Sequence, residues 1–283
     1  MRLQEQDVSR GGLANPAAAL TADGGLSAIT GFIRKTLVIA ELEARKIRHD
    51  PTDLLTRAVQ PALWLLVFGQ VFTQIRAIPT GNLRYIDFMA PGILAQSVLF
   101  IAIFSGITII WERDLGIIHK FLASPTPRAA LVLGKALSAG VRGLSQMLII
   151  YLLALLLGVQ LSWNPLFLIG TLVAVLLGAS LFSTFSLIIA CMVKTRERFM
   201  GIGQVLTMPL FFASNAIYPV AIMPLWLQII ARLNPLSYQV DLLRALMLGQ
   251  ANAGDVAVDF LILIAVTAVL IVIGARVYPR AAT

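Results

Sequence analysis

Long runs of apolar residues without charges constrain the fold of this chain more than any other feature. The longest run, residues 88–110, contains no Asp, Glu, Lys or Arg. A helix needs about 20 such residues to cross the roughly 30 Å hydrocarbon core of a bilayer. Because 58% of all residues are hydrophobic and only 13% are charged, we predict an all-α protein that crosses a membrane several times.

Six segments have the length and composition of a transmembrane helix. They are residues 54–75, 88–111, 136–159, 165–193, 199–218 and 256–274. Residues 221–250 are also apolar, but Pro224, the Asn234-Pro235 pair and Gly249 divide them into pieces too short to cross. We therefore expect short re-entrant or interfacial helices before the last span.

The remaining segments flank a six-span domain that we place at residues 51–276. Residues 1–30 lack the apolar core of a signal peptide and contain several Gly and Ala residues, so we expect a flexible tail. Residues 31–50 have apolar side chains at helical spacing with Arg and Lys between them. This pattern predicts an amphipathic helix on the membrane surface, with a solvated charged helix as the alternative. Residues 277–283 form a short C-terminal tail.

Lysine and arginine are unevenly distributed between the predicted loops. When the N-terminus is placed in the cytoplasm, and Arg2 and Arg10 of the tail are left out, the inner segments hold 16 of these residues and the outer segments hold 4. Positive residues collect in cytoplasmic loops of membrane proteins. We therefore expect both termini in the cytoplasm, and the net charge of +8 indicates a membrane rather than a nucleic acid as partner.

Residue patterns typical of other functions are missing from the sequence. An ion-coupled transporter normally has a carboxylate or a lysine within a span, and residues 88–111, 165–193 and 199–218 contain neither. Gly134-Lys135 is followed by Ala136 rather than Ser or Thr, so it is no ATP-binding P-loop. One cysteine and two distant histidines do not suggest a disulfide or a metal site. We predict neither catalytic residues nor a bound cofactor or metal on this chain.

The loop after the second predicted span has a pattern suited to contact with a soluble protein. Residues 115–122 lie between the charged Glu112-Arg113-Asp114 and the prolines Pro125 and Pro127. Within them, one helical face can gather Ile117, Ile118, Phe121 and Leu122. Such a helix can dock in a groove of a partner. The alternative is an ordinary loop whose apolar residues lie on the membrane.

Three segments resemble the permease subunits of type-2 ATP-binding-cassette (ABC) exporters, especially those of the drug-resistance type. They are Glu112-Arg113-Asp114-x-Gly116 followed by Leu122-Ala123-Ser124-Pro125; Asp50-Pro51 with Pro61 and Phe68-Gly69-x-Val71-Phe72; and Ser214-Asn215-Ala216-Ile217-Tyr218-Pro219 with Asn234-Pro235-Leu236-Ser237-Tyr238, Asp241 and Arg244. The resemblance covers roughly residues 30–276. His119-Lys120 departs from the family pattern, in which a more acidic or arginine-rich pair is expected.

The resemblance implies a transporter subunit of the bacterial inner membrane rather than an enzyme. Two copies would pair and bind separate ATPase subunits, which would hold ATP and Mg²⁺ on the cytoplasmic side. The amphipathic helix and a coupling helix at about residues 113–124 would contact the ATPase, and residues 221–248 would form a lid at the outer mouth. The implied coupling residues are Glu112, Arg113, Asp114, Gly116, Ile117, His119, Lys120, Phe121, Leu122 and Pro125.

Polar and aromatic side chains within two predicted spans are candidates for contact with the transported molecule. They are Gln96 and Phe100 on one span, and Gln204, Thr207, Phe211, Ser214 and Asn215 on the other. Such a mixture suits a hydrophobic or amphipathic cargo, such as a drug, a lipid or a glycolipid. Alternatively, these polar groups only form hydrogen bonds between helices. The alternative functions are export of a polysaccharide precursor, ion-coupled transport and a membrane enzyme acting on lipids.

Overall fold

The computed structural model describes residues 56, 59–75, 78–119 and 128–279. Every regular element within these ranges is a helix, as the sequence predicts. The expected tail at residues 1–30 and the expected amphipathic helix at residues 31–50 lie outside the described residues.

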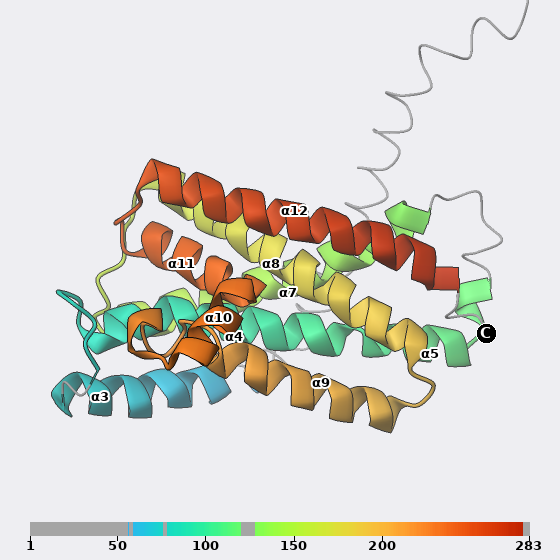
Figure 1. Ribbon diagram of the computed structural model, residues 1–283, viewed down its shortest axis with the longest axis horizontal. Coiled ribbons are helices and arrows are strands. Elements are labelled where there is room, and N and C mark those ends of the chain that lie inside the picture. Colours follow the sequence, from blue (N-terminus) through green and yellow to red (C-terminus); the bar gives the residue numbers. More distant parts are fainter. Residues whose placement is uncertain (1–55, 57–58, 76–77, 120–127, 280–283) are drawn as a thin grey trace, which may run out of the picture.

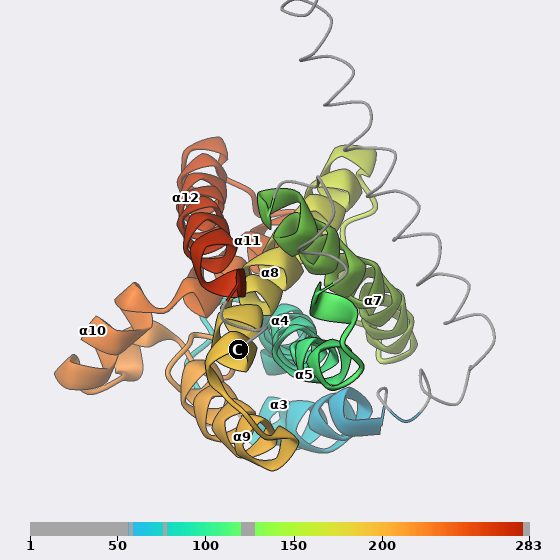
Figure 2. The same cartoon turned by 90° about the vertical axis from the view of Figure 1, so that its right-hand side faces the viewer.

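A central helix organises the bundle (Figure 1). Helix α4 (Tyr85–Ser105) continues through Gly106 into α5 (Ile107–Asp114). Viewed from the end, in Figure 2, this unit is surrounded by α7 (Arg128–Leu156), α8 (Pro165–Met192), α9 (Arg196–Phe212) and the pair formed by η1 (Trp64–Gly69) and α3 (Gln70–Ile75). Helix α12 (Ala253–Val277) packs outside α8.

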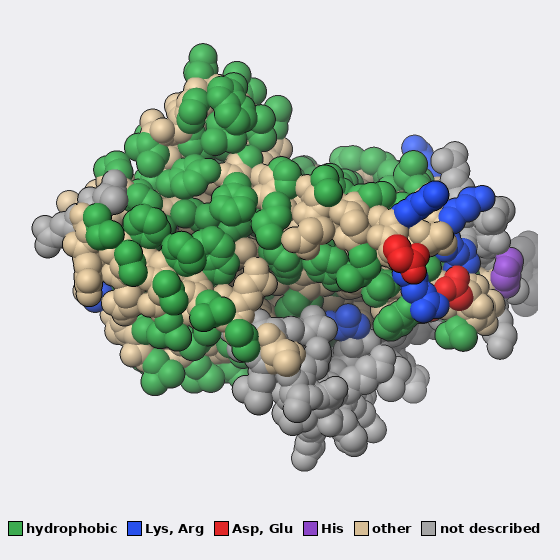
Figure 3. Space-filling view, turned by 90° about the horizontal axis from the view of Figure 1, so that it is seen from below, with side chains coloured by type: hydrophobic (Ala, Val, Ile, Leu, Met, Phe, Trp, Pro, Cys, Tyr) green, Lys and Arg blue, Asp and Glu red, His purple; other side chains and the backbone are tan. Residues whose placement is uncertain are grey.

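Burial differs sharply between the central and the peripheral helices. Nearly every residue of α4 is buried, including Asp87 and Gln96. On α12, by contrast, Leu261 is 67% exposed and Val269 is 57% exposed. A helix that is apolar on all sides needs either protein or lipid around it. Protein surrounds α4, whereas most of the α12 surface is an apolar exterior, and Figure 3 shows that the same kind of exterior covers much of the bundle.

Local sequence signals set the ends of several helices. The side chains of Asn164, Thr195, Asn234 and Asn252 each accept a hydrogen bond from a backbone N–H in the first turn of α8, α9, α11 (Pro235–Met247) and α12. These caps satisfy amide groups that have no partner within the helix. In Asn164-Pro165 and Asn234-Pro235, proline occupies the first helical position, where its missing N–H costs nothing.

Four of the described helices are long and apolar enough to cross a membrane. They are Tyr85–Asp114, Leu131–Leu156, Pro165–Met192 and Ala253–Val277. The other two expected spans correspond to a shorter apolar helix, Val59–Ile75, and to α9. The structure therefore confirms an all-helical membrane fold, and the count of six spans stays a prediction.

The segment expected to hold short helices contains η2 (Val220–Ile222), α10 (Leu225–Leu233) and α11. Helix α11 is held closely against α4, and so is Ala216, which lies just before this segment. A Cβ atom on Gly92 would lie only 2.8 Å from the Ala216 Cα and closer still to the Ala216 carbonyl oxygen. The guanidinium group of Arg244 lies 3.8 Å from the centre of the Phe88 ring and donates a 2.8 Å hydrogen bond to the Asn215 carbonyl. The re-entrant placement of these helices stays a prediction.

Candidate functional site

Charged side chains gather at one end of the bundle, which we call the charged end (Figure 3). It comprises Glu112, Arg113 and Asp114 at the end of α5, Lys135 in α7 and Arg196 at the start of α9. The three consecutive residues of α5 are those that the sequence predicts as contacts with a partner protein. In the structure, each of them contacts a different part of the same chain: α7, the link that follows α8, and α9.

Glu112 connects α5 to α7. The Lys135 ammonium donates hydrogen bonds to both carboxylate oxygens of Glu112, at 2.5 Å to Oε1. The two side chains are 21% and 24% exposed. An ion pair that is partly shielded from water is screened less by salt than a fully exposed pair. This contact therefore holds the start of α7 against the end of α5.

Arg113 connects α5 to the end of α8. Its Nη1 donates to the Val193 carbonyl at 3.0 Å, and its Nη2 donates to the Lys194 carbonyl at 2.6 Å. The residues in the link after α8 include carbonyls without a partner inside the helix, and this end of the helix dipole favours a positive charge. The planar guanidinium fork can serve two such carbonyls at once. Arg113 thereby holds the corner between α8 and α9.

Asp114 connects α5 to α9. Its Oδ2 accepts a 2.7 Å hydrogen bond from Nη2 of Arg196, the first residue of α9. The Arg196 guanidinium also lies 5.8 Å from the centre of the Trp111 ring, within the range of a cation–π contact. Both members of this ion pair are more than 40% exposed. It is thus the most solvent-accessible of the three connections.

A small apolar core lies behind these polar contacts. Its buried members include Ile109 and Ile118 from the region of α5, Leu187 from α8, Phe199 from α9 and Tyr278 from the C-terminal end. Burial raises the pKa of the Tyr278 phenol, and the Glu112 carboxylate raises it further. The phenol is therefore neutral. The charged end is a packed junction of five helices rather than a loose set of surface charges.

The predicted coupling segment is only partly described. Helix α5 ends at Asp114, the chain turns at Leu115 and Gly116, and helical residues resume at 117–119. Gly116 has φ of +67°, a conformation that glycine adopts without steric cost. Ile118 is fully buried whereas Leu115 is 71% exposed, so not all apolar residues of this segment share one face. Ile117 is half-buried and His119 is exposed. Lys120, Phe121, Leu122 and Pro125 lie outside the described residues.

The predicted cargo residues fall into two separate groups. Gln96 and Phe100 line a cavity of about 190 Å³, together with Gln60, Pro61, Ser97, Ile101, Phe104 and Gln146. No residue of α9 lines it. The polar groups Gln60 and Gln146 were missed by sequence analysis, although an amide within an apolar run was the available signal. The structure therefore places this cavity between the first apolar helix, α4 and α7.

The candidates on and after α9 contact other parts of the chain. Gln204 is exposed, and Thr207 donates to the Gly203 carbonyl of its own helix at 2.5 Å. Phe211 is buried with its ring edge-on to Trp64 at 6.0 Å. Two polar groups follow the helix: Ser214 donates to the Phe211 carbonyl at 2.7 Å, and Asn215 donates to Asp241 at 2.5 Å. Four of these five side chains are therefore occupied by internal packing or hydrogen bonds.

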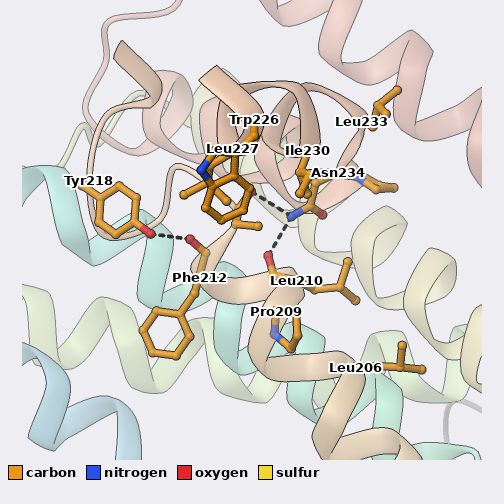
Figure 4. A pocket seen from close by; sticks show the side chains of 12 residues that line it. Leu206, Pro209, Leu210, Phe212, Tyr218, Trp226, Leu227, Ile230, Leu233 and Asn234 are labelled. Carbon is orange, nitrogen blue, oxygen red and sulfur yellow. Dashed lines mark hydrogen bonds between the residues drawn. The ribbon is translucent and has the colours of Figure 1, made fainter. Parts of the chain in front are cut away.

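A second, larger hollow lies between α9 and α10 (Figure 4). Its volume is about 580 Å³, and side chains such as Leu206, Phe212 and Trp226 line it. The polar groups that reach it are already paired: Tyr218 donates to the Phe212 carbonyl at 2.6 Å, and Asn234 donates to the Leu210 carbonyl at 2.7 Å. This hollow thus presents almost only carbon atoms. Among the described residues, no group of three or more His, Cys, Asp or Glu side chains is arranged to hold a metal ion.

Comparison with known proteins identifies the family. Residues 34–248 match the family described as ABC-2 type transporter. The chain is 31% identical over 218 residues to the putative transport permease ycf38 of Cyanophora paradoxa, covering 76% of this chain and 74% of that protein. It is 27% identical over 232 residues to the daunorubicin resistance ABC transporter permease protein DrrB1 of Streptomyces coeruleorubidus, covering 82% and 81%.

A third relative is the probable multidrug ABC transporter permease YbhR of Escherichia coli K12. The identity is 27% over 173 residues, which cover 60% of this chain and 46% of that protein. The family match extends over about three quarters of the chain and includes the whole charged end and both hollows. The chain therefore belongs to the ABC-2 type transporter family, as a membrane-embedded permease subunit that the family pairs with an ABC ATPase.

Proposed function

We propose that this chain is the transmembrane subunit of an ATP-driven exporter in the bacterial plasma membrane. Its cargo is hydrophobic or amphipathic: a drug, a lipid or a glycolipid. A separate ATPase subunit binds ATP and Mg²⁺ and hydrolyses the nucleotide, and this chain holds no cofactor. The observation that carries the proposal is the charged end, where three consecutive residues connect one helix to three others.

The proposed coupling follows from those connections. An ATPase that moves residues 113–124 acts on a segment whose base is attached to α7 by Glu112, to the end of α8 by Arg113 and to α9 by Asp114. ATP binding can shift the population of two transporter conformations only through contacts that differ between them. Side chains that attach the coupling segment to several helices provide such contacts.

The proposed topology has six crossings with both termini in the cytoplasm. Helix α9 has 17 residues, so it is about 26 Å long at 1.5 Å per residue, close to the roughly 30 Å hydrocarbon core. Val59–Ile75 is equally long. These two helices join the four long ones, and α10 and α11 form re-entrant helices at the outer mouth. The charged end then faces the cytoplasm, in agreement with the preference of Arg and Lys for that side.

The proposed assembly contains two copies of this chain and two ATPase subunits. Residues 31–50 lie on the membrane surface beside the ATPase, and the coupling segment docks into it. The large exposed apolar surface of the described helices requires either lipid or a second copy around it.

A drug-like or lipid-like cargo is favoured over a polysaccharide precursor. Two relatives carry names that refer to daunorubicin resistance and to multidrug transport. The linings of both hollows contain no charged side chain; the larger one is almost entirely apolar, and the smaller one has three amides and one hydroxyl. A sugar chain would need many hydrogen-bonding partners, because each buried hydroxyl without a partner costs free energy. Gln96 and Phe100 are the proposed cargo contacts that these linings support; the candidates at 204–215 stay predictions.

The test is purification of the tagged chain from its native host in a mild detergent, followed by an assay of vanadate-sensitive ATPase. We expect an ATPase subunit to co-purify, and inside-out vesicles to accumulate daunorubicin only when ATP is present. Purification without any nucleotide-binding partner would contradict the proposal and would favour ion-coupled transport.

A further inference from the structure

We propose that the cavity lined by Gln96 binds the uncharged, ring-bearing part of the cargo, and that the Gln96 amide forms a hydrogen bond with a carbonyl or hydroxyl group on it. The proposal rests on the transport function proposed above. It adds the location of a cargo-binding site, the chemical class of the group bound there, and the residue that selects this group. The site lies between the first apolar helix, α4 and α7, away from α9.

The unpaired amide of Gln96 is the first observation. Gln96 is 3% exposed, and no side chain or backbone group among the described residues forms a hydrogen bond with its amide. Burying an amide without a partner costs about 1–3 kcal/mol in proteins. Gln96 lines the cavity, so a molecule bound there can supply the missing hydrogen-bond partner of its amide.

Some buried polar groups of the bundle are satisfied within their own helix, whereas the buried Gln239 amide also lacks a partner among the described residues but does not line this cavity. Ser97 donates to the Ile93 carbonyl at 2.8 Å, and Thr267 donates to the Leu263 carbonyl at 2.6 Å. Each therefore uses a carbonyl of its own helix, one turn earlier, and needs no further partner. The longer Gln96 side chain makes no such bond. Its amide forms part of the cavity wall instead.

The composition of the cavity restricts its ligand to an uncharged one. Three amides and one hydroxyl line it, from Gln60, Gln96, Gln146 and Ser97, and no charged residue does. A phosphate or an ammonium group placed there would lose its hydration without gaining a counter-ion, which costs several kcal/mol. A neutral group that accepts or donates a hydrogen bond matches the amide of Gln96 without that cost.

The aromatic residues favour a ring system. The Phe100 and Phe104 rings lie on the same wall with their centres 6.1 Å apart, and aromatic faces and edges pack well against another flat ring. The volume of about 190 Å³ is below the roughly 300–1,000 Å³ of sites that enclose a whole drug-sized ligand. The cavity therefore holds one or a few fused rings while the rest of the cargo lies outside it.

The test uses two probes that differ only in hydrogen-bonding groups. Anthraquinone and anthracene share a flat three-ring frame, and only the former carries carbonyl groups. Saturable binding of each is measured to the full-length chain in lipid nanodiscs, with protein-free nanodiscs as background. The variant is Gln96→Leu, and Gln96→Met serves where the Leu variant folds poorly. Gln74→Leu makes the same chemical change on an exposed face of α3 outside the cavity.

We expect Gln96→Leu to weaken anthraquinone binding about tenfold, the loss of one hydrogen bond, and to change anthracene binding less than twofold. Gln74→Leu should alter neither. Equal anthraquinone affinity in the Gln96 variants and the wild type would overturn the proposal. An equal loss of affinity for anthraquinone and anthracene in Gln96→Leu would also overturn it, because that result would indicate damaged packing. The absence of saturable binding to the wild type would overturn it as well. The assay needs no ATPase, so its failure differs from a failure of the ATPase to co-purify.

Discussion

Removing the Arg113 side chain should uncouple the transporter without unfolding it. In Arg113→Ala, the carbonyls of Val193 and Lys194 lose their guanidinium donors, at 3.0 and 2.6 Å. Hydrogen bonds to charged groups contribute about 1.5–3 kcal/mol each when shielded, but an exposed contact contributes much less. The Arg113 side chain is 20% exposed and the bond to Lys194 is an exposed one. We therefore assign the pair about 2 kcal/mol, roughly a 30-fold change in the equilibrium that holds the α8–α9 corner to α5.

The loss should remain local. Ile109, Leu187 and Phe199 still pack together in the apolar core behind the charged end, and the caps of α8 and α9 are unchanged. In vesicles that contain the permease and its ATPase, we expect normal assembly and near-normal ATP hydrolysis. The amount of daunorubicin, used as the probe of the proposed transport, that is moved per ATP should fall several-fold, because these bonds no longer transmit a displacement of the coupling segment to the α8–α9 corner.

Two further variants separate the contacts from the charge. Arg198→Ala removes a positive charge from the same corner, at an exposed position, and should leave the transport ratio unchanged. Arg113→Lys keeps the charge but lacks the planar fork, so an intermediate ratio is expected. An unchanged ratio in Arg113→Ala would refute the role of these bonds in coupling. Equal losses in Arg113→Ala and Arg198→Ala would show that net charge, not the fork, matters.

Two other predictions concern the remaining contacts. Reversing one charge of the exposed pair, by Asp114→Arg or Arg196→Asp, should lower the amount of cargo transported per ATP, and the double exchange should restore at least half of the lost transport. Because the pair is exposed, its contribution to the stability of the detergent-solubilised protein should be small. A double-mutant cycle should give a coupling energy of about 0.2–1 kcal/mol. Gly92→Ala should lower the melting temperature clearly, because its Cβ would collide with the Ala216 backbone, whereas Gly201→Ala, with no atom within 4 Å of the added Cβ, should be neutral or slightly stabilising. Equal melting of the two alanine variants would contradict the close contact.

The sequence predicted the long helices well because their signal is local. An uncharged apolar run defines α4, α8 and α12, and Asn164 and Asn252 mark where the last two begin. The shorter segments are ambiguous for the same reason. Helix α9 has 17 residues, so its length alone does not decide between crossing the membrane and lying within the protein.

The functional candidates could be found from sequence only in part. Glu112, Arg113 and Asp114 stand out as a charged group after an apolar run, but their partners lie 23, 80 and 82 residues away in sequence. No local pattern encodes such distances. For Thr207, helical spacing predicted a polar face toward a pathway, yet its hydroxyl bonds to its own helix. Spacing gives the direction of a side chain, but not what lies opposite it.

The two candidate sites lie on one continuous unit, and this has a thermodynamic consequence. Gln96 in α4 and Arg113 in α5 are 17 residues apart, about 26 Å along a helix. At Gly106, where the two helices join, an added Cβ would lie 2.9 Å from the Phe199 ring of α9. If α5 is displaced, it moves against α9 at Gly106, where no free space remains. Helix α4, which continues into α5, must therefore move as well. Suppose that the cargo and the nucleotide-bound ATPase each stabilise one conformation of the α4–α5 unit. Thermodynamic linkage then requires that nucleotide binding changes the affinity for cargo by the same factor as cargo binding changes the affinity for nucleotide. Arg113→Ala should reduce both effects equally, while Gln96→Leu should weaken cargo binding and leave nucleotide affinity without cargo unchanged.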